Sequence, residues 1–345
     1  MSDHKSRMPG DEPTSLTAGF TLGHGRGLVF AYWILPEGGV RELTLQEAEA
    51  ALERREGLVW LHLDITSMLA KTWIEERKAL SAVAREMLVT HENRTQVHVM
   101  EDGLAGILCD FHHELTDVDW RINMMHFYAN RHCLITGRRH ALAAIERTQR
   151  DLAQGLKVAS GIELLAAILE ALGDLMDDAS EEIGRAIEHA EDRVESEPKS
   201  GRILLSAARK QAILFHRSLT AERRVIGRLA ARPPAWFEPA DHAALQAAIE
   251  HLSSVADELE TLQVRTRLIQ DEIAAQLAEN TNRNLYVLSV VSAILLPMTL
   301  ISGIYGMNLG GLPGLSSAYG FWIGLGEIGV VGLITVIILR AAKIL

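Results

Sequence analysis

The sequence predicts an α+β membrane protein that has an N-terminal α/β cytoplasmic domain, a long helical stalk and two C-terminal transmembrane helices. Short apolar runs alternate with helical stretches at the start, a seven-residue apolar repeat follows, and the last part is almost free of charge. The 345 residues suffice for two or three domains. We expect boundaries at residues 28–140, 141–283 and 284–345, after a flexible polar tail at residues 1–27.

The composition excludes several classes of protein. The 34 Lys and Arg residues against 45 Asp and Glu residues give a net charge of −11, whereas nucleic-acid binding needs a basic face. Two cysteines are too few for a disulfide-rich secreted scaffold. Because of the acidic net charge, we expect no nucleic-acid partner. No nucleophile and base can be paired from the sequence, so we do not expect an enzyme.

Six short apolar runs in the first 140 residues predict strands. We expect these strands at residues 28–35, 58–65, 97–100, 104–111, 124–129 and 132–136. Helical patterns at residues 47–55 and 70–89 lie between them. Strands interleaved with helices predict an α/β domain.

Long helices follow this domain. Helical periodicity covers residues 161–195 and 201–231, and the intervening residues 196–200 contain a proline and predict a hairpin turn. A third helix at residues 241–304 would be ~95 Å long at 1.5 Å per residue. Its a and d positions are Leu245, Leu252, Leu259, Thr266, Ile273 and Asn280, and Ala248, Val255, Leu262, Ile269 and Gln276. This stripe predicts a stalk helix that packs on neighbours.

The C-terminal part predicts a transmembrane hairpin. The 56 residues between Arg283 and Arg340 contain one Asp, Glu, Lys or Arg, which is Glu327. They form a first span at about residues 285–305, a loop at 306–320 and a second span at about 321–339, each span about 20 residues long. Arg283, Arg340 and Lys343 flank the hairpin, and the loop has no cation. We therefore expect both termini in the cytoplasm and a periplasmic loop, in a multi-pass protein of the cytoplasmic membrane.

The first span carries a stripe of small and polar residues with leucines interleaved. The polar members are Asn282, Ser289, Ser292, Thr299, Gly303 and Asn308, and the leucines are Leu285, Leu288 and Leu296. Hydroxyl and amide groups suit a path for hydrated ions, and leucine rings can gate it by dewetting. Packing of helix on helix explains the same residues equally well. Because two helices cannot enclose a water-filled path, conduction requires several copies around an axis.

Three further groups of ionisable residues attract attention. Glu327 within the second span is a candidate proton site, or it hydrates near the outer interface. Cys109 and His113 share a face of one predicted strand and are ligand types that suit zinc. The acidic run at residues 174–195 predicts a solvated helix face.

Four residues at the end of the first span carry a family resemblance. Tyr305-Gly306-Met307-Asn308 resembles the Gly-Met-Asn signature of the CorA metal ion transporter superfamily, and Leu309-Gly310-Gly311-Leu312-Pro313-Gly314 resembles its ZntB-like zinc transporter branch. Trp60-Leu61-His62-Leu63-Asp64 and Arg209-Lys210-Gln211 are also similar to that branch. The chain departs from the family in two places. Its loop lacks the acid of magnesium-type members, and its tail lacks the usual basic cluster with Trp.

The resemblance implies a homopentameric funnel whose first spans line a pore. Asn308 would form a ring of side-chain oxygens for a hydrated cation at the outer mouth, and Gly306 and Met307 would support it. The implied function is zinc transport across the cytoplasmic membrane, with proton coupling left open. The implied partners are other copies of the chain, membrane lipid and transported divalent cations, without a cofactor. The alternatives are a CorA-type magnesium or cobalt channel and a membrane-anchored sensor without transport.

Overall fold

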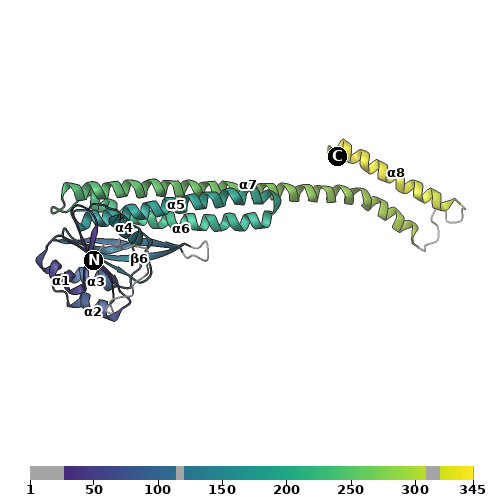
Figure 1. Cartoon of the computed structure of the whole chain (residues 1–345). Helices are drawn as coiled ribbons and strands as arrows, with labels where there is room; N and C mark the ends of the chain where they lie inside the picture. The colour runs from purple at the N-terminus through teal and green to yellow at the C-terminus, as the bar shows by residue number, and fades with distance from the viewer. Residues whose placement is uncertain (1–26, 114–119, 308–318, 345) are drawn as a thin grey trace, which may run out of the picture. The chain divides into compact units, whose positions relative to one another are not determined.

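The computed structural model describes residues 27–113, 120–307 and 319–344. The chain divides into two compact units, Met1–Thr266 and Arg267–Leu345. The first unit contains a mixed sheet and most of the helices, and the second contains the end of one long helix and all of another. Figure 1 shows the order of these elements along the chain.

A seven-stranded sheet forms the centre of the first unit. Its strands are β1 (Leu28–Ile34), β2 (Val40–Glu42), β3 (Leu58–Asp64), β4 (Gln96–Val99), β5 (Leu104–His113), β6 (Trp120–Ala129) and β7 (Cys133–Arg138). They are arranged in the order β2-β1-β3-β7-β6-β5-β4. β3 and β7 pair in parallel, and all other neighbours are antiparallel. All six predicted strands are confirmed, whereas the short edge strand β2 was not predicted.

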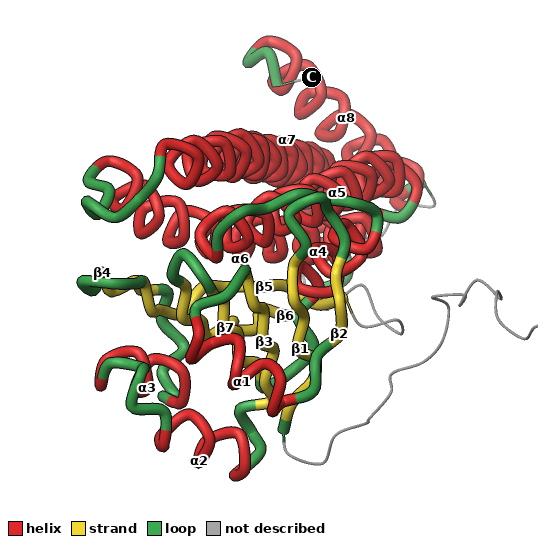
Figure 2. Tube along the Cα trace, turned by 60° about the vertical axis from the view of Figure 1, so that its left-hand side comes forward, coloured by secondary structure: helices red, strands yellow, loops and turns green. Residues whose placement is uncertain are grey.

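Helices cover both faces of the sheet, as Figure 2 shows. One face packs on α1 (Leu45–Arg54), α2 (Met68–Glu76) and α3 (Ala82–Val89), and the core there includes Leu61, Ile74 and Leu88. The helical pattern predicted at residues 70–89 is confirmed, but it is interrupted at residues 77–81. Two helices form, because the Ser81 hydroxyl accepts a hydrogen bond from the Ala84 amide and starts a new helix.

The opposite face packs on α4 (Ala143–Ala153) and on the helices that follow. α4 was not predicted, and its N-cap residue Leu142 has no capping side chain. Instead, the buried carboxylate of Asp110 in β5 accepts a hydrogen bond from the Ala144 amide at 3.1 Å. A cap supplied from a distant strand leaves no local signal in the sequence.

Three long helices complete the fold of the first unit. α5 (Gly161–Ser196) and α6 (Pro198–Ala231) form a hairpin, and Glu197 alone separates them, because Pro198 begins α6 directly. α7 (Pro239–Tyr305) is 67 residues long. The predicted stripe on its first part is buried from Leu245 to Leu259 and again at Thr266, with Leu262 half-buried, so this part is a packed helix as expected.

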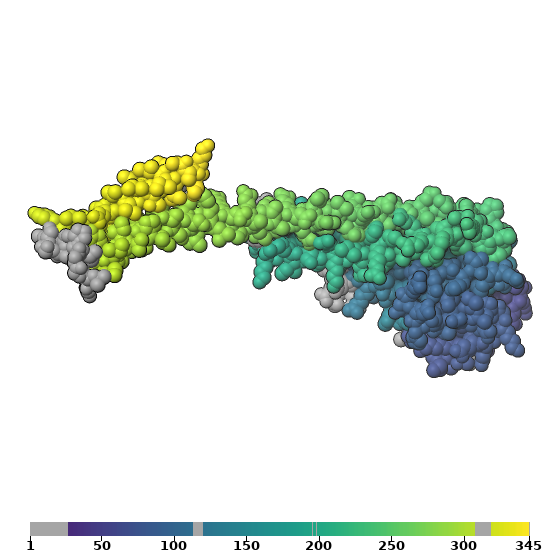
Figure 3. All heavy atoms as spheres, turned by 180° about the vertical axis from the view of Figure 1, so that it is seen from behind, coloured from purple at the N-terminus to yellow at the C-terminus, as the bar shows by residue number. Residues whose placement is uncertain are grey.

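The second unit pairs the end of α7 with α8 (Gly320–Ala341), as Figure 3 shows. Both helices are long and apolar enough to cross a membrane. α8 presents small residues to α7. A Cβ atom at Gly332 would lie 3.2 Å from the sulfur of Met298, and one at Gly324 would lie 3.8 Å from the ring of Tyr305. Glycines therefore permit the close packing of the two helices.

Candidate ion-conducting site

The predicted polar stripe lies on an exposed face of α7. Asn282, Ser289, Ser292, Thr299 and Gly303 are all exposed in the single chain. The three leucines between them, Leu285, Leu288 and Leu296, are 55%, 62% and 69% exposed. Large apolar side chains with this exposure need either lipid or another protein surface to cover them.

The stripe points away from α8. Met298 and Tyr305 of α7 contact α8 and lie seven residues apart, which places them on one side of the helix. At about 100° per residue, Leu296 lies roughly 160° around the helix from Met298, and Gly303 lies roughly 140° from it. Most of the predicted pore residues therefore lie on the face of α7 opposite to Met298, while Thr299 and Leu288, at roughly 100° and 80° from Met298, lie at its edges.

The hydroxyl of Thr299 shows how a polar side chain is accommodated on this face. Its Oγ1 donates a hydrogen bond to the carbonyl of Leu296 at 2.9 Å, which leaves the oxygen lone pairs directed outward. Pro297 lies inside the helix next to Leu296 and lacks an amide donor for the turn before it. The predicted path thus combines hydroxyl oxygens with the backbone carbonyl that lacks the amide of Pro297 as its donor.

The signature residues begin where α7 ends. The amides of Gly306 and Met307 donate to the carbonyls of Ser302 at 3.0 Å and Ile304 at 3.2 Å, so both residues continue the last turn. The Met307 side chain is half exposed. Asn308 and the following residues 309–314, which carry the ZntB-like resemblance, lie outside the described residues.

Glu327 of α8 has a partner that the sequence analysis missed. The hydroxyl of Tyr305 donates a hydrogen bond to its Oε2 at 2.7 Å. Tyr305 directly precedes Gly306, so the carboxylate of the second span contacts the residue next to the signature. In the sequence, the only indication of such a partner is that Glu327 is the one charged residue in an apolar span.

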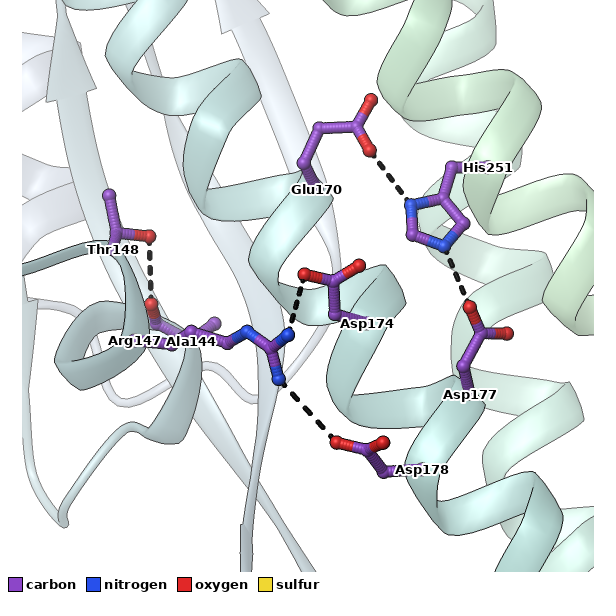
Figure 4. Close-up of polar contacts among 8 residues, drawn as sticks. All are labelled: Ala144, Arg147, Thr148, Glu170, Asp174, Asp177, Asp178 and His251. Carbon is purple, nitrogen blue, oxygen red and sulfur yellow. Dashed lines mark hydrogen bonds and ion pairs between the residues drawn. The ribbon is translucent and has the colours of Figure 1, made fainter. Parts of the chain in front are cut away.

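A second charged cluster lies among α4, α5 and α7 in the first unit, and Figure 4 shows it in detail. His251 of α7 bonds through Nδ1 to Glu170 at 2.8 Å and through Nε2 to Asp177 at 2.9 Å. Burial disfavours the charged ring, but the hydrogen bonds to Asp177 and Glu170 and their charges outweigh it and raise the pKa of His251. Arg147 of α4 pairs with Asp174 of α5 at 2.9 Å.

This cluster corrects the interpretation of the acidic run on α5. The run is not simply a solvated face, because His251 and Arg147 bind its first part. Arg265 of α7 binds its second part and bonds to Glu191 at 2.7 Å. The acidic side chains of α5 therefore bind basic side chains of α4 and α7, and they are not only exposed to solvent.

Cys109 is engaged with a carboxyl group rather than with a second soft ligand. Its thiol donates to Oε2 of Glu222 in α6, and both side chains are buried. Burial raises the pKa of the Cys109 thiol and raises the pKa of Glu222 to about 8. Both groups are therefore protonated at neutral pH, which disfavours metal binding.

The zinc site at Cys109 and His113 stays a prediction. The backbone of His113 ends β5, while its side chain is outside what the structure describes. Within residues 27–113, 120–307 and 319–344, His, Cys, Asp and Glu side chains form no group of three or more that is placed to hold a metal ion.

Fold and site together define a class of protein, a membrane protein in which a mixed α/β domain and long helices precede two apolar helices. A sequence profile described as "CorA-like Mg2+ transporter protein" matches residues 55–341. The chain therefore belongs to the CorA-like family of divalent metal cation transporters, and the resemblance seen in the sequence is confirmed.

Individual relatives agree with this assignment. The zinc transport protein ZntB of Pectobacterium atrosepticum is 27% identical over 305 residues, which cover 88% of this chain and 92% of that protein. Two solved structures share the fold. Full-length CmaX has a TM-score of 0.76 and 23% identity, covering 93% of this chain and 99% of that one. The CorA magnesium transporter of Methanocaldococcus jannaschii has a TM-score of 0.73 and 19% identity, covering 90% of this chain and 96% of that one. The predicted fold class is confirmed.

Proposed function

We propose that this chain transports zinc across the cytoplasmic membrane through a homopentameric pore lined by α7. The observation that carries the proposal is the polar stripe of α7, which is exposed in one copy and opposite to α8. In a bilayer, several copies around an axis bring such stripes together around water, which a single hairpin cannot enclose. Relatives named zinc transport protein that match most of the chain support zinc as the cation.

Each part of the stripe has a distinct role in this proposal. The side-chain oxygens of Asn308 form a neutral ring at the outer mouth and hydrogen-bond the water shell of a divalent cation. Thr299, Ser292, Ser289 and Asn282 continue the polar path inward. Leu296, Leu288 and Leu285 form the constrictions. Both termini face the cytoplasm, because Arg283, Arg340 and Lys343 flank the hairpin.

A magnesium or cobalt channel is the second candidate, because the family description names Mg2+. The loop sequence favours zinc over this alternative, since residues 306–320 contain no acidic side chain to attract a strongly hydrated magnesium ion. A membrane anchor without transport is the third. It gives no reason for a polar stripe on the face of α7 away from α8.

The test is cation uptake into liposomes that contain the purified full-length chain. Zinc entry that rises with an inward proton gradient supports the zinc transporter and its proton coupling. Entry that is independent of the gradient and competed by magnesium supports the channel. Absence of flux of either ion from folded, oligomeric protein refutes transport.

A matched pair of variants tests the role of the stripe. Thr299→Val and Thr335→Val each remove a hydroxyl that bonds a carbonyl of its own helix, at 2.9 Å in α7 and 2.8 Å in α8. We expect Thr299→Val to reduce zinc flux about tenfold, while Thr335→Val leaves it unchanged. Asn308→Ala should abolish flux. Equal effects of the two threonine variants would contradict the assignment of the stripe to the pore.

A further inference from the structure

Glu327 and Tyr305 form a contact at the point where α7 gives way to the signature. Glu327 is the one Asp, Glu, Lys or Arg among residues 284–339. An ionisable group at such a position is costly in a membrane unless it has a polar partner. The hydroxyl of Tyr305 provides this partner at 2.7 Å. The contact joins α8 to the last residue of α7.

Helix α8 holds the tyrosine at two points. Gly324 is buried and lies three residues before Glu327, so both face the same side of α8. The ring of Tyr305 lies against Gly324, where an added Cβ atom would be 3.8 Å from Cδ2 and Cε2. The ring therefore packs on the glycine while the hydroxyl bonds the carboxylate one turn later. A ring held at both ends has little freedom to change its direction.

This double attachment fixes the start of the signature. Tyr305 is covalently joined to Gly306, and the Gly306 amide still bonds the carbonyl of Ser302 at 3.0 Å. Met307 follows with a half-exposed side chain. Movement of Tyr305 away from α8 would thus move the residues on which the proposed outer ring is built.

We infer that Glu327 is a positioning residue, which acts through Tyr305 to orient Gly306 and Met307, the first two residues of the signature, for cation entry. The inference rests on the proposed transport function. A side-chain oxygen at residue 327 accepts the hydrogen bond from the Tyr305 hydroxyl, and an amide oxygen can accept it as well. The positioning role requires an acceptor oxygen at this place, and it does not require Glu327 to release and bind a proton in each transport cycle.

Conservative substitutions separate positioning from proton transfer. Glu327→Gln keeps an acceptor oxygen without a titratable proton, Glu327→Ala removes the acceptor, and Tyr305→Phe removes the donor. We expect Glu327→Ala and Tyr305→Phe each to lower zinc uptake about fivefold, and the double variant to be no worse than either. Glu327→Gln should retain most of the uptake. Thr335→Val on the same helix serves as the control.

A second readout reports position without any transport. Met307→Cys introduces a thiol next to the contact, and the native Cys109 and Cys133 are both buried. The rate at which a membrane-impermeant maleimide labels this thiol should change about threefold in the Glu327→Ala background and stay unchanged in the Glu327→Gln background.

The outcomes distinguish the two proposals. Absence of flux from the unaltered chain refutes the transport function, whereas the labelling rates still decide whether Glu327 positions the signature. Unchanged uptake and labelling in Glu327→Ala would overturn the inference. Loss of uptake in Glu327→Gln together with full uptake in Tyr305→Phe would also overturn it, because the carboxyl group would then act through its own proton.

Discussion

Replacement of His251 by glutamine should weaken the first unit in a way that depends on pH. His251 joins α7 to α5 through two carboxylates, Glu170 and Asp177, one at each ring nitrogen. Only the protonated ring donates to both. The neutral ring has one donor, and its bare nitrogen faces the other carboxylate. A glutamine amide likewise donates to one carboxylate at a time across this gap.

The size of the effect follows from the exposure of the three side chains. A hydrogen bond to a charged group contributes about 1.5–3 kcal/mol when it is well shielded. Here His251 is 23% exposed, and Glu170 and Asp177 are 40% and 46% exposed. Screening by solvent reduces each bond to about 1 kcal/mol. The protonated ring makes two such bonds and the glutamine makes one, so His251→Gln should cost the folded unit about 1 kcal/mol at low pH, which corresponds to about 2–4 °C in melting temperature.

The pH dependence has a definite sign. The pKa of His251 in the folded protein lies above its unfolded value of about 6.5. The stabilisation is therefore complete below about pH 6.5 and is lost as the pH rises through the folded pKa. The difference in melting temperature between the unaltered chain and His251→Gln should be largest near pH 5.5 and should shrink towards pH 8.5.

Thermal unfolding of the full-length chain in detergent measures this difference. Five of the six tryptophans lie within residues 1–266, so tryptophan fluorescence reports mainly on the first unit. His189→Gln is the control, because His189 is an exposed histidine of α5, the helix that carries Glu170 and Asp177. A difference in melting temperature that stays constant between pH 5.5 and 8.5, or that grows with pH, would refute the role of protonated His251 in joining α7 to α5.

Two further predictions concern buried positions of the first unit. Gly173→Ala should lower the melting temperature at pH 6 by several degrees, because the new Cβ would lie 2.7 Å from Nδ1 of the His251 ring. Gly184→Ala on the same helix meets its nearest atom only at 4.0 Å and should raise the melting temperature, as helix propensity predicts. Equal changes in melting temperature for Gly173→Ala and Gly184→Ala would show that contact with the His251 ring does not cause the loss. Glu222→Gln should be neutral near pH 5 and increasingly stabilising up to about pH 8. The folded chain keeps a proton on Glu222 to about pH 8 while the unfolded chain releases it near 4.3, so the unaltered protein loses stability over this range. Parallel pH profiles of the two proteins, measured by the same fluorescence assay, would show that Glu222 is ionised in the fold.

The sequence predicts most of the fold because hydrophobic pattern dominates it. The strand at Leu58–Asp64 is a continuous buried run, and the stripe from Leu245 to Thr266 repeats every seven residues. The elements that escaped prediction depend on distant partners. α4 (Ala143–Ala153) takes its cap from Asp110, and β2 (Val40–Glu42) has only three residues that pair with β1. The buried residues of α4, Ala144, Ile145, Thr148 and Leu152, do follow a helical period, but its cap leaves no local signal, and three residues are too few to show the period of a strand.

The residue types of the candidate site are legible in the sequence, but their partners are not. The apolar span around Glu327 marks this residue as unusual, whereas its bond to Tyr305 depends on how α7 and α8 pack. The acidic run on α5 is plain in the sequence, whereas its pairing with His251 and Arg147 requires three helices to converge. Contacts between distant segments are set by packing, so a single sequence cannot specify them.

The direction of the polar stripe narrows what the serines and threonines of α7 can do. If they served to pack α7 on α8 within one chain, small and polar residues of α7 would face α8. At the two buried glycines of α8, Gly332 and Gly324, the neighbours on α7 are instead the large side chains of Met298 and Tyr305. Ser289, Ser292 and Thr299 remain exposed on the other side. The proposed ring of copies around a hydrated path would give these hydroxyls water or a further copy of the chain as partners, whereas lipid offers them none.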